Sequence, residues 1–106
     1  MLLFVSYELR PSTDVDEFRR WSRDTDIAAT RALPGVGYFA GAKDPESERR
    51  FIEFIQVDDS VAHDADSWNA HVSKNMPLLG QEQFGKYVDV STVNITQYDE
   101  TEAFTG

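Results

Sequence analysis

The chain has 106 residues, of which 41% are hydrophobic and 12% aromatic, so its length and composition fit one folded domain. Ten Lys and Arg residues stand against 19 Asp and Glu, and the net charge of -9 disfavours nucleic acid and anionic membrane surfaces as partners. There is no cysteine, which excludes disulfides, thiolate nucleophiles and cysteine-bound metal centres.

The first predicted element is a β-strand at residues 2–9, where side chains alternate between two faces. A helix follows, with Thr13 or Asp14 as its cap and the Leu33-Pro34-Gly35 turn as its end. Apolar and small residues recur in it at intervals of three and four, which predicts a single buried stripe. The stripe consists of Val15, Phe18, Trp21, Thr25, Ala28, Ala29 and Ala32.

Two strands come next, at residues 36–42 and 50–57, and a polar turn at residues 43–49 joins them. The pattern then becomes helical, with a helix near residues 67–75 and one or two further turns around residues 78–87. No boundary between these two helical stretches is evident from the pattern.

A final strand at residues 88–98 completes the order β-α-β-β-α-β. This order predicts a ferredoxin-like α+β fold, in which one four-stranded antiparallel sheet carries two helical regions on one face. We expect residues 1–98 to form this single domain. Residues 99–106 are expected to be an acidic C-terminal tail, ordered only if Phe104 docks against the domain.

The strand at residues 50–57 is apolar on both of its faces. Phe51 and Ile55 point to one side, whereas Ile52 and Phe54 point to the other. A bare apolar sheet face is an interaction surface or an aggregation hazard. The pattern therefore favours a homodimer in which two sheets face each other as a dimeric α+β barrel, and the alternative is that the tail covers this face.

The same helix-free face is the predicted ligand-binding surface. Glu8 and Asn94 are expected on it, with the aromatic ring of Tyr38 nearby. Hydrogen-bonding groups mixed with aromatic rings are typical of small-molecule pockets. A solvated sheet surface has a similar composition, so both interpretations stay open.

His71 is one of two histidines and falls on the predicted helix near Trp68, Asn69 and Asn75. A neutral imidazole in that setting can take a proton from an N–H group or an enolisable carbon while its neighbours hold the substrate. The alternative is that Trp68 is core and His71 lies at its solvated edge. His63 fits a solvated loop, and no metal site is predicted because no ligand spacing is specific enough.

Two carboxylates stand where solvated charge is not expected. Asp26 lies late in the first helix, where the helix dipole disfavours an anion. Glu53 lies in the middle of an apolar strand, where an unpaired carboxylate is costly or has a raised pKa. Each is a candidate acid or base, although Glu53 can instead pair with Arg50 or Lys43.

The sequence contains neither a glycine-rich phosphate loop nor a nucleophile elbow, so no nucleotide cofactor is expected. Its apolar start is short and lacks a basic region, and no long apolar stretch follows. The expectation is therefore a protein without a signal peptide or transmembrane helix, located in the cytoplasm.

Four stretches resemble the REDY-like branch of the dimeric α+β barrel superfamily, which is named for proteins of prodigiosin-type and bisindole pigment pathways. They are residues 15–21, 26–36 and 51–59 and the Gln83-Phe84 pair, and Asp26 matches the acidic position of the branch. The chain departs from the branch at Ile27-Ala28, where a Tyr-Pro pair is usual, and in a short loop before the third strand. The resemblance implies a small homodimer of secondary metabolism that acts on pyrrole- or indole-derived intermediates.

Three functions follow from these observations. The first is an enzyme that cyclises or couples an aromatic nitrogen heterocycle by acid–base assistance, without a cofactor. Its expected catalytic residues are His71, Asp26 and Glu53, and its expected substrate-binding residues are Trp68, Asn69, Asn75, Tyr38, Glu8 and Asn94. The second is a cofactor-independent oxygenase of an electron-rich aromatic, and the third is a non-catalytic protein that holds a reactive intermediate.

Overall fold

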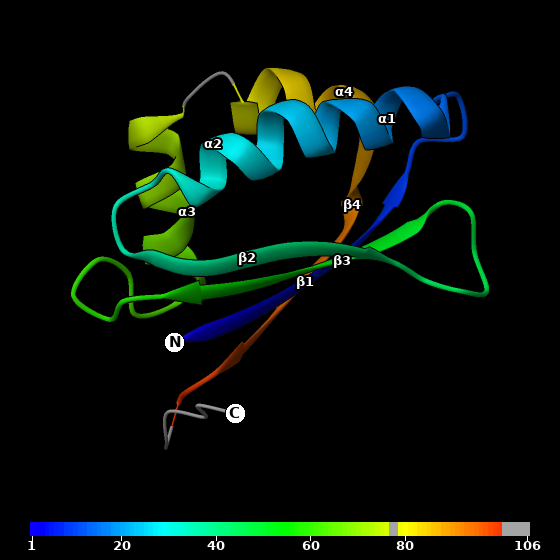
Figure 1. The fold of residues 1–106 in the computed structure, drawn as a ribbon. Helices are drawn as coiled ribbons and strands as arrows, with labels where there is room; N and C mark the ends of the chain where they lie inside the picture. Colours follow the sequence, from blue (N-terminus) through cyan, green and yellow to red (C-terminus); the bar gives the residue numbers. More distant parts are fainter. Residues whose placement is uncertain (77–78, 101–106) are drawn as a thin grey trace.

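The computed structural model describes residues 1–76 and 79–100, and it shows one four-stranded antiparallel sheet with the helices packed on one face (Figure 1). The strand order is β2-β3-β1-β4, so the first and third strands lie in the centre. The strands are β1 (Leu2–Leu9), β2 (Val36–Lys43), β3 (Arg50–Val57) and β4 (Val88–Tyr98). The predicted ferredoxin-like α+β fold is confirmed, and β2 alone departs from its predicted bounds, by one residue at its end.

The first helical region is continuous but not uniform. It consists of α1 (Val15–Trp21), a π-helical segment η1 (Ser22–Ile27) and α2 (Ala28–Arg31). Asp14 is the cap, because its side chain accepts a hydrogen bond of 3.0 Å from the backbone of Glu17. Thr13, the other predicted cap, is buried and donates its hydroxyl to the Tyr87 carbonyl at 2.6 Å.

The π-helical segment corrects the predicted buried stripe. A π turn holds more residues than an α turn, so every residue after it is rotated relative to an uninterrupted helix. Asp26 and Thr30 consequently face the core, whereas Ala28 and Ala32 are exposed. The predicted stripe is therefore wrong at Ala28 and Ala32, and Asp26 lies on the buried face of the helix.

The second helical region begins with α3 (Ala65–Asn75), two residues earlier than predicted. Asp64 and Ser67 form a reciprocal cap, with the Asp64 carboxylate accepting from the Ser67 backbone at 2.8 Å. A π-helical segment η2 (Leu79–Phe84) and α4 (Gly85–Tyr87) lead into β4. The passage between the two predicted helical stretches at residues 77–78, and Phe104, on whose docking an ordered tail was conditional, lie outside the described residues. Within those residues, no helix is long and apolar enough to cross a membrane.

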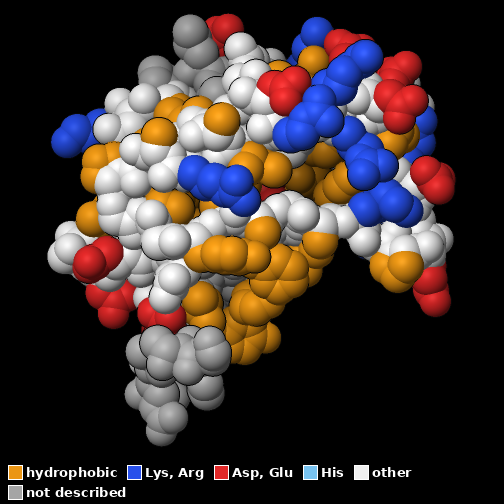
Figure 2. Space-filling model, in the orientation of Figure 1, with side chains coloured by type: hydrophobic (Ala, Val, Ile, Leu, Met, Phe, Trp, Pro, Cys, Tyr) orange, Lys and Arg blue, Asp and Glu red, His pale blue; other side chains and the backbone are white. Residues whose placement is uncertain are grey.

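The core fills the space between the sheet and the helices. At one end of it an aromatic cluster joins β1, β3 and α1, because the Phe18 ring packs 6.1 Å from Tyr7 and 5.1 Å from Phe51, measured between centroids. The opposite face of the sheet carries a smaller cluster, in which Phe4 lies 4.7 Å from Phe54 and 5.2 Å from Tyr98. Figure 2 shows hydrophobic side chains along this helix-free underside, and Tyr98 is 53% exposed.

Candidate functional site

A cavity of about 280 Å³ lies between the sheet and the helices, and most of its lining is apolar. We call it the acidic cavity, because Asp26 and Glu53 are the only charged residues of its described lining. Strands β1 to β4 and segments η1, α2, α3 and η2 all contribute to its wall. The lining residues are Val5, Asp26, Thr30, Phe39, Glu53, Ile55, Trp68, Asn69, Val72, Ser73, Met76, Phe84, Val93 and Ile95.

Both carboxylates are almost fully buried, each with 8% of its surface exposed. The Tyr7 hydroxyl donates a hydrogen bond of 3.0 Å to Glu53 Oε1. On the other carboxylate, Thr30 Oγ1 donates to Asp26 Oδ1 at 3.5 Å, a long contact. No arginine or lysine forms an ion pair with either group within the described residues.

The local sequence explains how the two acids meet. Strand alternation turns Glu53 to the helix side together with Phe51 and Ile55. In the sheet register Val5 lies opposite Glu53, which places Tyr7 on the diagonal, within reach of its carboxylate. The π-helical segment then turns Asp26 toward β3. A carboxylate in an apolar strand and a change of rotation in the helix therefore place both acids in one cavity.

Burial changes the ionisation of this pair. Loss of hydration raises the pKa of Glu53 to about 8, and the nearby charge of Asp26 adds to the effect, whereas the Tyr7 hydrogen bond opposes it. Loss of hydration likewise raises the pKa of Asp26 to about 6, against the lowering effect of its Thr30 hydrogen bond. Burial and the two neighbouring carboxylates raise the pKa of Tyr7 well above its usual value.

With pKa values of about 6 for Asp26 and about 8 for Glu53, one carboxyl group of the pair is ionised and the other is protonated near neutral pH. One group then acts as an acid and the other as a base at the same pH, which is the division of roles found in enzymes with paired carboxyl groups. Because the cavity wall is apolar, a proton moved here meets little competition from solvent.

Two of the predicted substrate-binding residues, Trp68 and Asn69, line the acidic cavity from α3. His71 and Asn75 do not. His71 Nε2 lies 3.1 Å from the Pro34 carbonyl oxygen, and the Asn75 side-chain amide donates to the backbone oxygen of His71 at 2.8 Å. The structure therefore directs His71 to the turn before β2.

The remaining three predicted residues lie away from the acidic cavity. Glu8 forms an ion pair of 2.7 Å with Arg50, Tyr38 is 57% exposed, and Asn94 is exposed on β4. The acidic cavity is on the helix side of the sheet, whereas the sequence placed the pocket on the helix-free face. The roles expected of these three residues stay predictions.

Sequence reasoning missed Tyr7 and Thr30, which hold the two carboxyl groups. For Tyr7 the available signal was its place on the helix side of β1, because a buried mid-strand carboxylate needs a donor from a neighbouring strand. Thr30 follows Asp26 by four residues, one helical turn, but the α-helical stripe had placed neither residue in the core.

The acidic cavity offers two carboxylate ligands to a metal ion and no histidine. More generally, residues 1–76 and 79–100 contain no group of three or more His, Asp or Glu side chains arranged to hold a metal ion.

The sheet order and the helices on a single face define the class of protein to which this chain belongs, an α+β fold shared with dimeric α+β barrel proteins. A family model described as "REDY-like protein HapK" matches residues 1–98, and the chain belongs to this REDY-like family. The predicted membership is thereby confirmed. No curated protein sequence matches the chain significantly.

Solved structures share the fold at low identity. PA3566 of Pseudomonas aeruginosa has a TM-score of 0.69 at 17% identity, over 95% of this chain and 93% of that one. HapK of Hahella chejuensis has a TM-score of 0.64 at 19% identity, over 98% and 99%. A mutant of SnoaB, a cofactor-independent oxygenase of Streptomyces nogalater, has a TM-score of 0.68 at 11% identity, over 99% and 97%.

Proposed function

We propose that this protein is an enzyme that protonates and deprotonates a small aromatic nitrogen heterocycle in the acidic cavity. The observation that carries the proposal is the buried Asp26–Glu53 pair, which faces an apolar cavity without a balancing cation among the described residues. Burying two acids in this way is costly to the fold, and raised pKa values of this kind concentrate at catalytic sites.

Glu53 is the proposed acid, because its raised pKa leaves it protonated at neutral pH. Asp26 is the proposed base, because its pKa of about 6 leaves it ionised at pH 7. Tyr7 is a positioning residue, since its hydroxyl bonds Glu53 Oε1 and fixes the direction of that carboxyl group. A proton can then be given to one atom of the substrate and taken from another.

The chemistry of the cavity limits the substrate. An anionic group would be repelled by Asp26, whereas a heterocyclic N–H can donate to it. Aromatic rings of Trp68, Phe39 and Phe84 in the wall fit a planar ring. A volume of about 280 Å³ is near the lower end of small-molecule sites, so a pyrrole or indole unit fits better than a large pigment. We place the reaction in secondary metabolism, as a cyclisation or coupling step, in line with the pigment pathways for which the REDY-like family is named.

The test is hydrogen–deuterium exchange at carbon 3 of indole in D₂O, followed by NMR. A deuteron from the Glu53 carboxyl forms the new C–D bond, and the Asp26 carboxylate removes the proton from the same carbon, so the ring is restored. We expect the wild-type protein to accelerate this exchange. Glu53→Gln and Asp26→Asn should each slow it by about 100-fold, which is the usual weight of one acid–base group.

The matched control is Glu8→Gln, which removes a carboxylate outside the acidic cavity and should leave the rate unchanged. Equal rates in wild type and Glu53→Gln would overturn the proposal, and so would a wild type that binds indole without accelerating exchange, which favours a binding protein. The catalytic role predicted for His71 is decided in the same assay. A loss in His71→Ala comparable to that in Glu53→Gln would assign it to the proton path, whereas an unchanged rate removes it.

A second candidate is a cofactor-independent oxygenase, in which Asp26 deprotonates an electron-rich aromatic that then reacts with O₂. Its support is the buried base in an apolar cavity, together with the fold shared with SnoaB. Oxygen separates the two candidates. Consumption of O₂ by wild type with a pyrrole or indole substrate, lost under anaerobic conditions, would favour the oxygenase.

We also propose that the protein forms a homodimer through the helix-free face of the sheet. The Phe4, Phe54 and Tyr98 cluster on that face supports this, since a monomer would leave these rings in water. Light scattering after gel filtration should give twice the chain mass. Phe54→Glu should shift it to the monomer, and Ala28→Glu on the exposed side of α2 should not. A wild type that is monomeric at all concentrations would contradict the proposal.

A further inference from the structure

A second cavity lies on the same side of the sheet, next to the acidic one. Its volume is about 200 Å³, and it opens between the helix of α1 and η1 and the strand β2. We call it the basic cavity, because its described lining contains Arg19, Arg23 and Lys43 and no acid. In a chain with a net charge of -9, three cations around one hollow run against the overall composition. Figure 2 shows the gathering of Lys and Arg side chains beside hydrophobic ones on this face.

The inner wall of the basic cavity is aromatic. Tyr7, Phe18 and Phe51 contribute it, with Tyr7 and Phe51 stacked at an interplanar angle of 17° and their centroids 6.3 Å apart. Phe18 stands against Phe51 at 63°. Rings held in such a cluster present a rigid surface to a further flat ring, at little cost in side-chain entropy.

The basic cavity is open on its outer side partly because one residue of its lining has no side chain. Gly41 lies on β2 and lines the basic cavity, and a Cβ added there would come within 3.6 Å of Ile27 Cδ1. A side chain at position 41 would therefore point toward η1. Because Gly41 has no side chain, the gap between β2 and η1 stays open.

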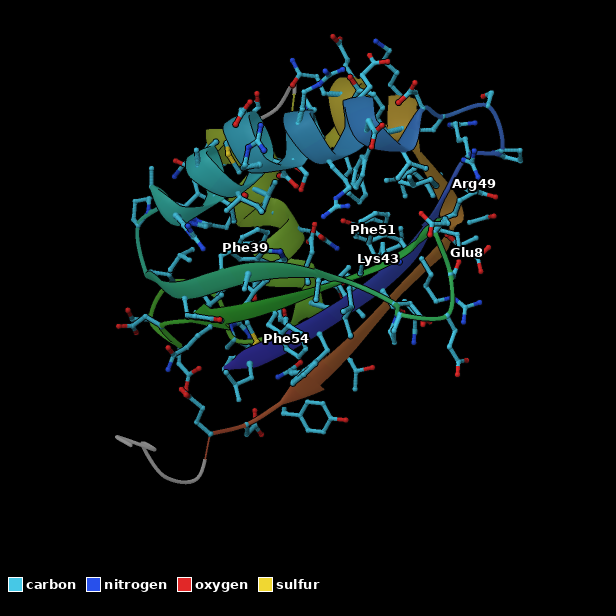
Figure 3. The ribbon with its side chains drawn as sticks, turned by 45° about the vertical axis from the view of Figure 1, so that its right-hand side comes forward. Glu8, Phe39, Lys43, Arg49, Phe51 and Phe54 are labelled. Atoms are coloured by element: carbon cyan, nitrogen blue, oxygen red, sulfur yellow. The ribbon has the colours of Figure 1, made fainter. Side chains whose placement is uncertain are left out.

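The cations are placed to hold an anion at the mouth of the basic cavity. Lys43 pairs with Phe51 in the sheet register, and both point to the helix side, where Figure 3 shows them close together. Its ammonium group donates to the carbonyl oxygens of Asp44 and Ser47 at 3.1 and 3.2 Å, which fixes its position and leaves a third N–H.

The two arginines complete the rim from α1 and η1. Arg23 is paired with Asp24 at 2.8 Å in an exposed ion pair, which weakens its attraction for a ligand. Arg19, one helical turn earlier, forms no ion pair within residues 1–76 and 79–100. Arg19 and Lys43 are therefore the main cations for a ligand.

We infer that the basic cavity is a second binding site, separate from the acidic one, for a planar aromatic carboxylate. The ring lies against Tyr7, Phe18 and Phe51, and the carboxylate accepts hydrogen bonds from Arg19 and Lys43. The site does not depend on the proposed acid–base function, because neither Asp26 nor Glu53 lines it.

Benzoate is the probe, with benzamide as its neutral counterpart and acetate as the anion without a ring. Titrations of the full chain are followed by the backbone amide signals of Gly41 and Ile27 for the basic cavity, and of Asn69 and Ser73 for the acidic cavity. Benzoate should shift the first two signals and bind about tenfold more tightly than either benzamide or acetate, a difference that two charge-assisted hydrogen bonds or one buried ring can supply.

Arg19→Gln combined with Lys43→Met should abolish the preference for benzoate over benzamide. Arg20→Gln is the matched control, because it removes the same charge from the next residue of α1, which lines neither cavity, and should keep the preference. Gly41→Leu should fill the gap and weaken both ligands. Glu53→Gln should bind benzoate as the wild type does. Benzoate binding and the proposed catalysis can therefore each fail without the other.

Four outcomes would overturn the inference. The first is equal affinity for benzoate and benzamide in the wild type, and the second is a response at Asn69 and Ser73 instead of Gly41 and Ile27. The third is an equal loss in Arg20→Gln, which would reduce the effect to the general charge of α1. The fourth is acetate binding as tightly as benzoate, which would show that the aromatic wall contributes nothing to binding.

Discussion

The acidic and basic cavities share one side of one sheet and differ in the sign and the burial of their charges. Glu53 lines the first and Tyr7 the second, and the hydrogen bond between them joins the two walls. The acids are buried and have raised pKa values, whereas Arg19 and Arg23 on the other rim are exposed. Burial thus produces groups that exchange protons, and exposure leaves solvated charges suited to holding a ligand.

The largest expected effect comes from the aromatic wall of the basic cavity. Phe18 is 1% exposed and packs on Tyr7 and Phe51, so Phe18→Ala should lower the free energy of unfolding by about 4 kcal/mol, as expected when a core aromatic is truncated. Urea denaturation measures the change. Tyr38→Ala, at a site 57% exposed, is the control and should cost less than about 1 kcal/mol. Similar losses in the two variants would contradict the described core.

The next effect concerns the acidic cavity and is a dependence of the free energy of unfolding on pH. The pKa of Glu53 is 4.5 in an unperturbed chain and about 8 in the fold, so between these values the folded state binds more protons than the unfolded state. The free energy of unfolding must therefore fall as pH rises through this window. Glu53→Gln removes that loss and should be more stable than the wild type at pH 9, with little difference at pH 4.

The measurement is urea denaturation at several pH values between 4 and 9. Glu8→Gln is the control, since its carboxylate lies in a half-exposed pair with Arg50, and its profile should run parallel to that of the wild type. A Glu53→Gln protein that loses stability toward high pH as steeply as wild type would show that Glu53 is already ionised in the fold.

The two cavities also show which features of the structure could be predicted from the sequence. Strand alternation is a local property, so the bounds of β1, β3 and β4 could be predicted, as could the unusual position of Glu53 within β3. The position of Asp26 could not be derived from helical spacing, because η1 changes the rotation of everything after Trp21. Asp26 was singled out by the helix dipole and by the family resemblance instead.

Non-local contacts account for the rest. The partnership of Tyr7 with Glu53 depends on the register of β1 against β3, and the cations of the basic cavity come from α1, η1 and β2, which no sequence spacing relates. The predicted pocket was placed on the helix-free face because that face combined polar and aromatic residues. Within one chain the helices form a second layer on the opposite face of the sheet, and the acidic cavity lies there.

A smaller effect tests the hydrogen bond between the two walls. Tyr7→Phe removes the donor to Glu53 but keeps the ring, so the free energy of unfolding should fall by about 1 kcal/mol at neutral pH. Because the hydrogen bond lowers the pKa of Glu53, its loss should extend the decline in stability to higher pH. Benzoate binding should persist, since the aromatic wall remains.

Tyr87→Phe is the matched control for this change. Its hydroxyl donates to Glu17 at 3.3 Å on the exposed side of α1, and its loss should leave the pH profile where it is in the wild type. Equal shifts of the profile in the two tyrosine variants would contradict a specific effect of Tyr7 on Glu53.

The smallest expected effect is the strictest test of whether the charges of the two cavities act independently. Arg19→Gln removes a charge from the basic cavity, but solvent already stabilises that charge, so the midpoint of thermal unfolding should move by less than about 2 °C at both pH 5 and pH 9. Benzoate affinity should fall in the same protein. A change in stability that depends on pH would place the Arg19 charge in the electrostatics of Asp26 and Glu53, and the two cavities would then form one coupled site.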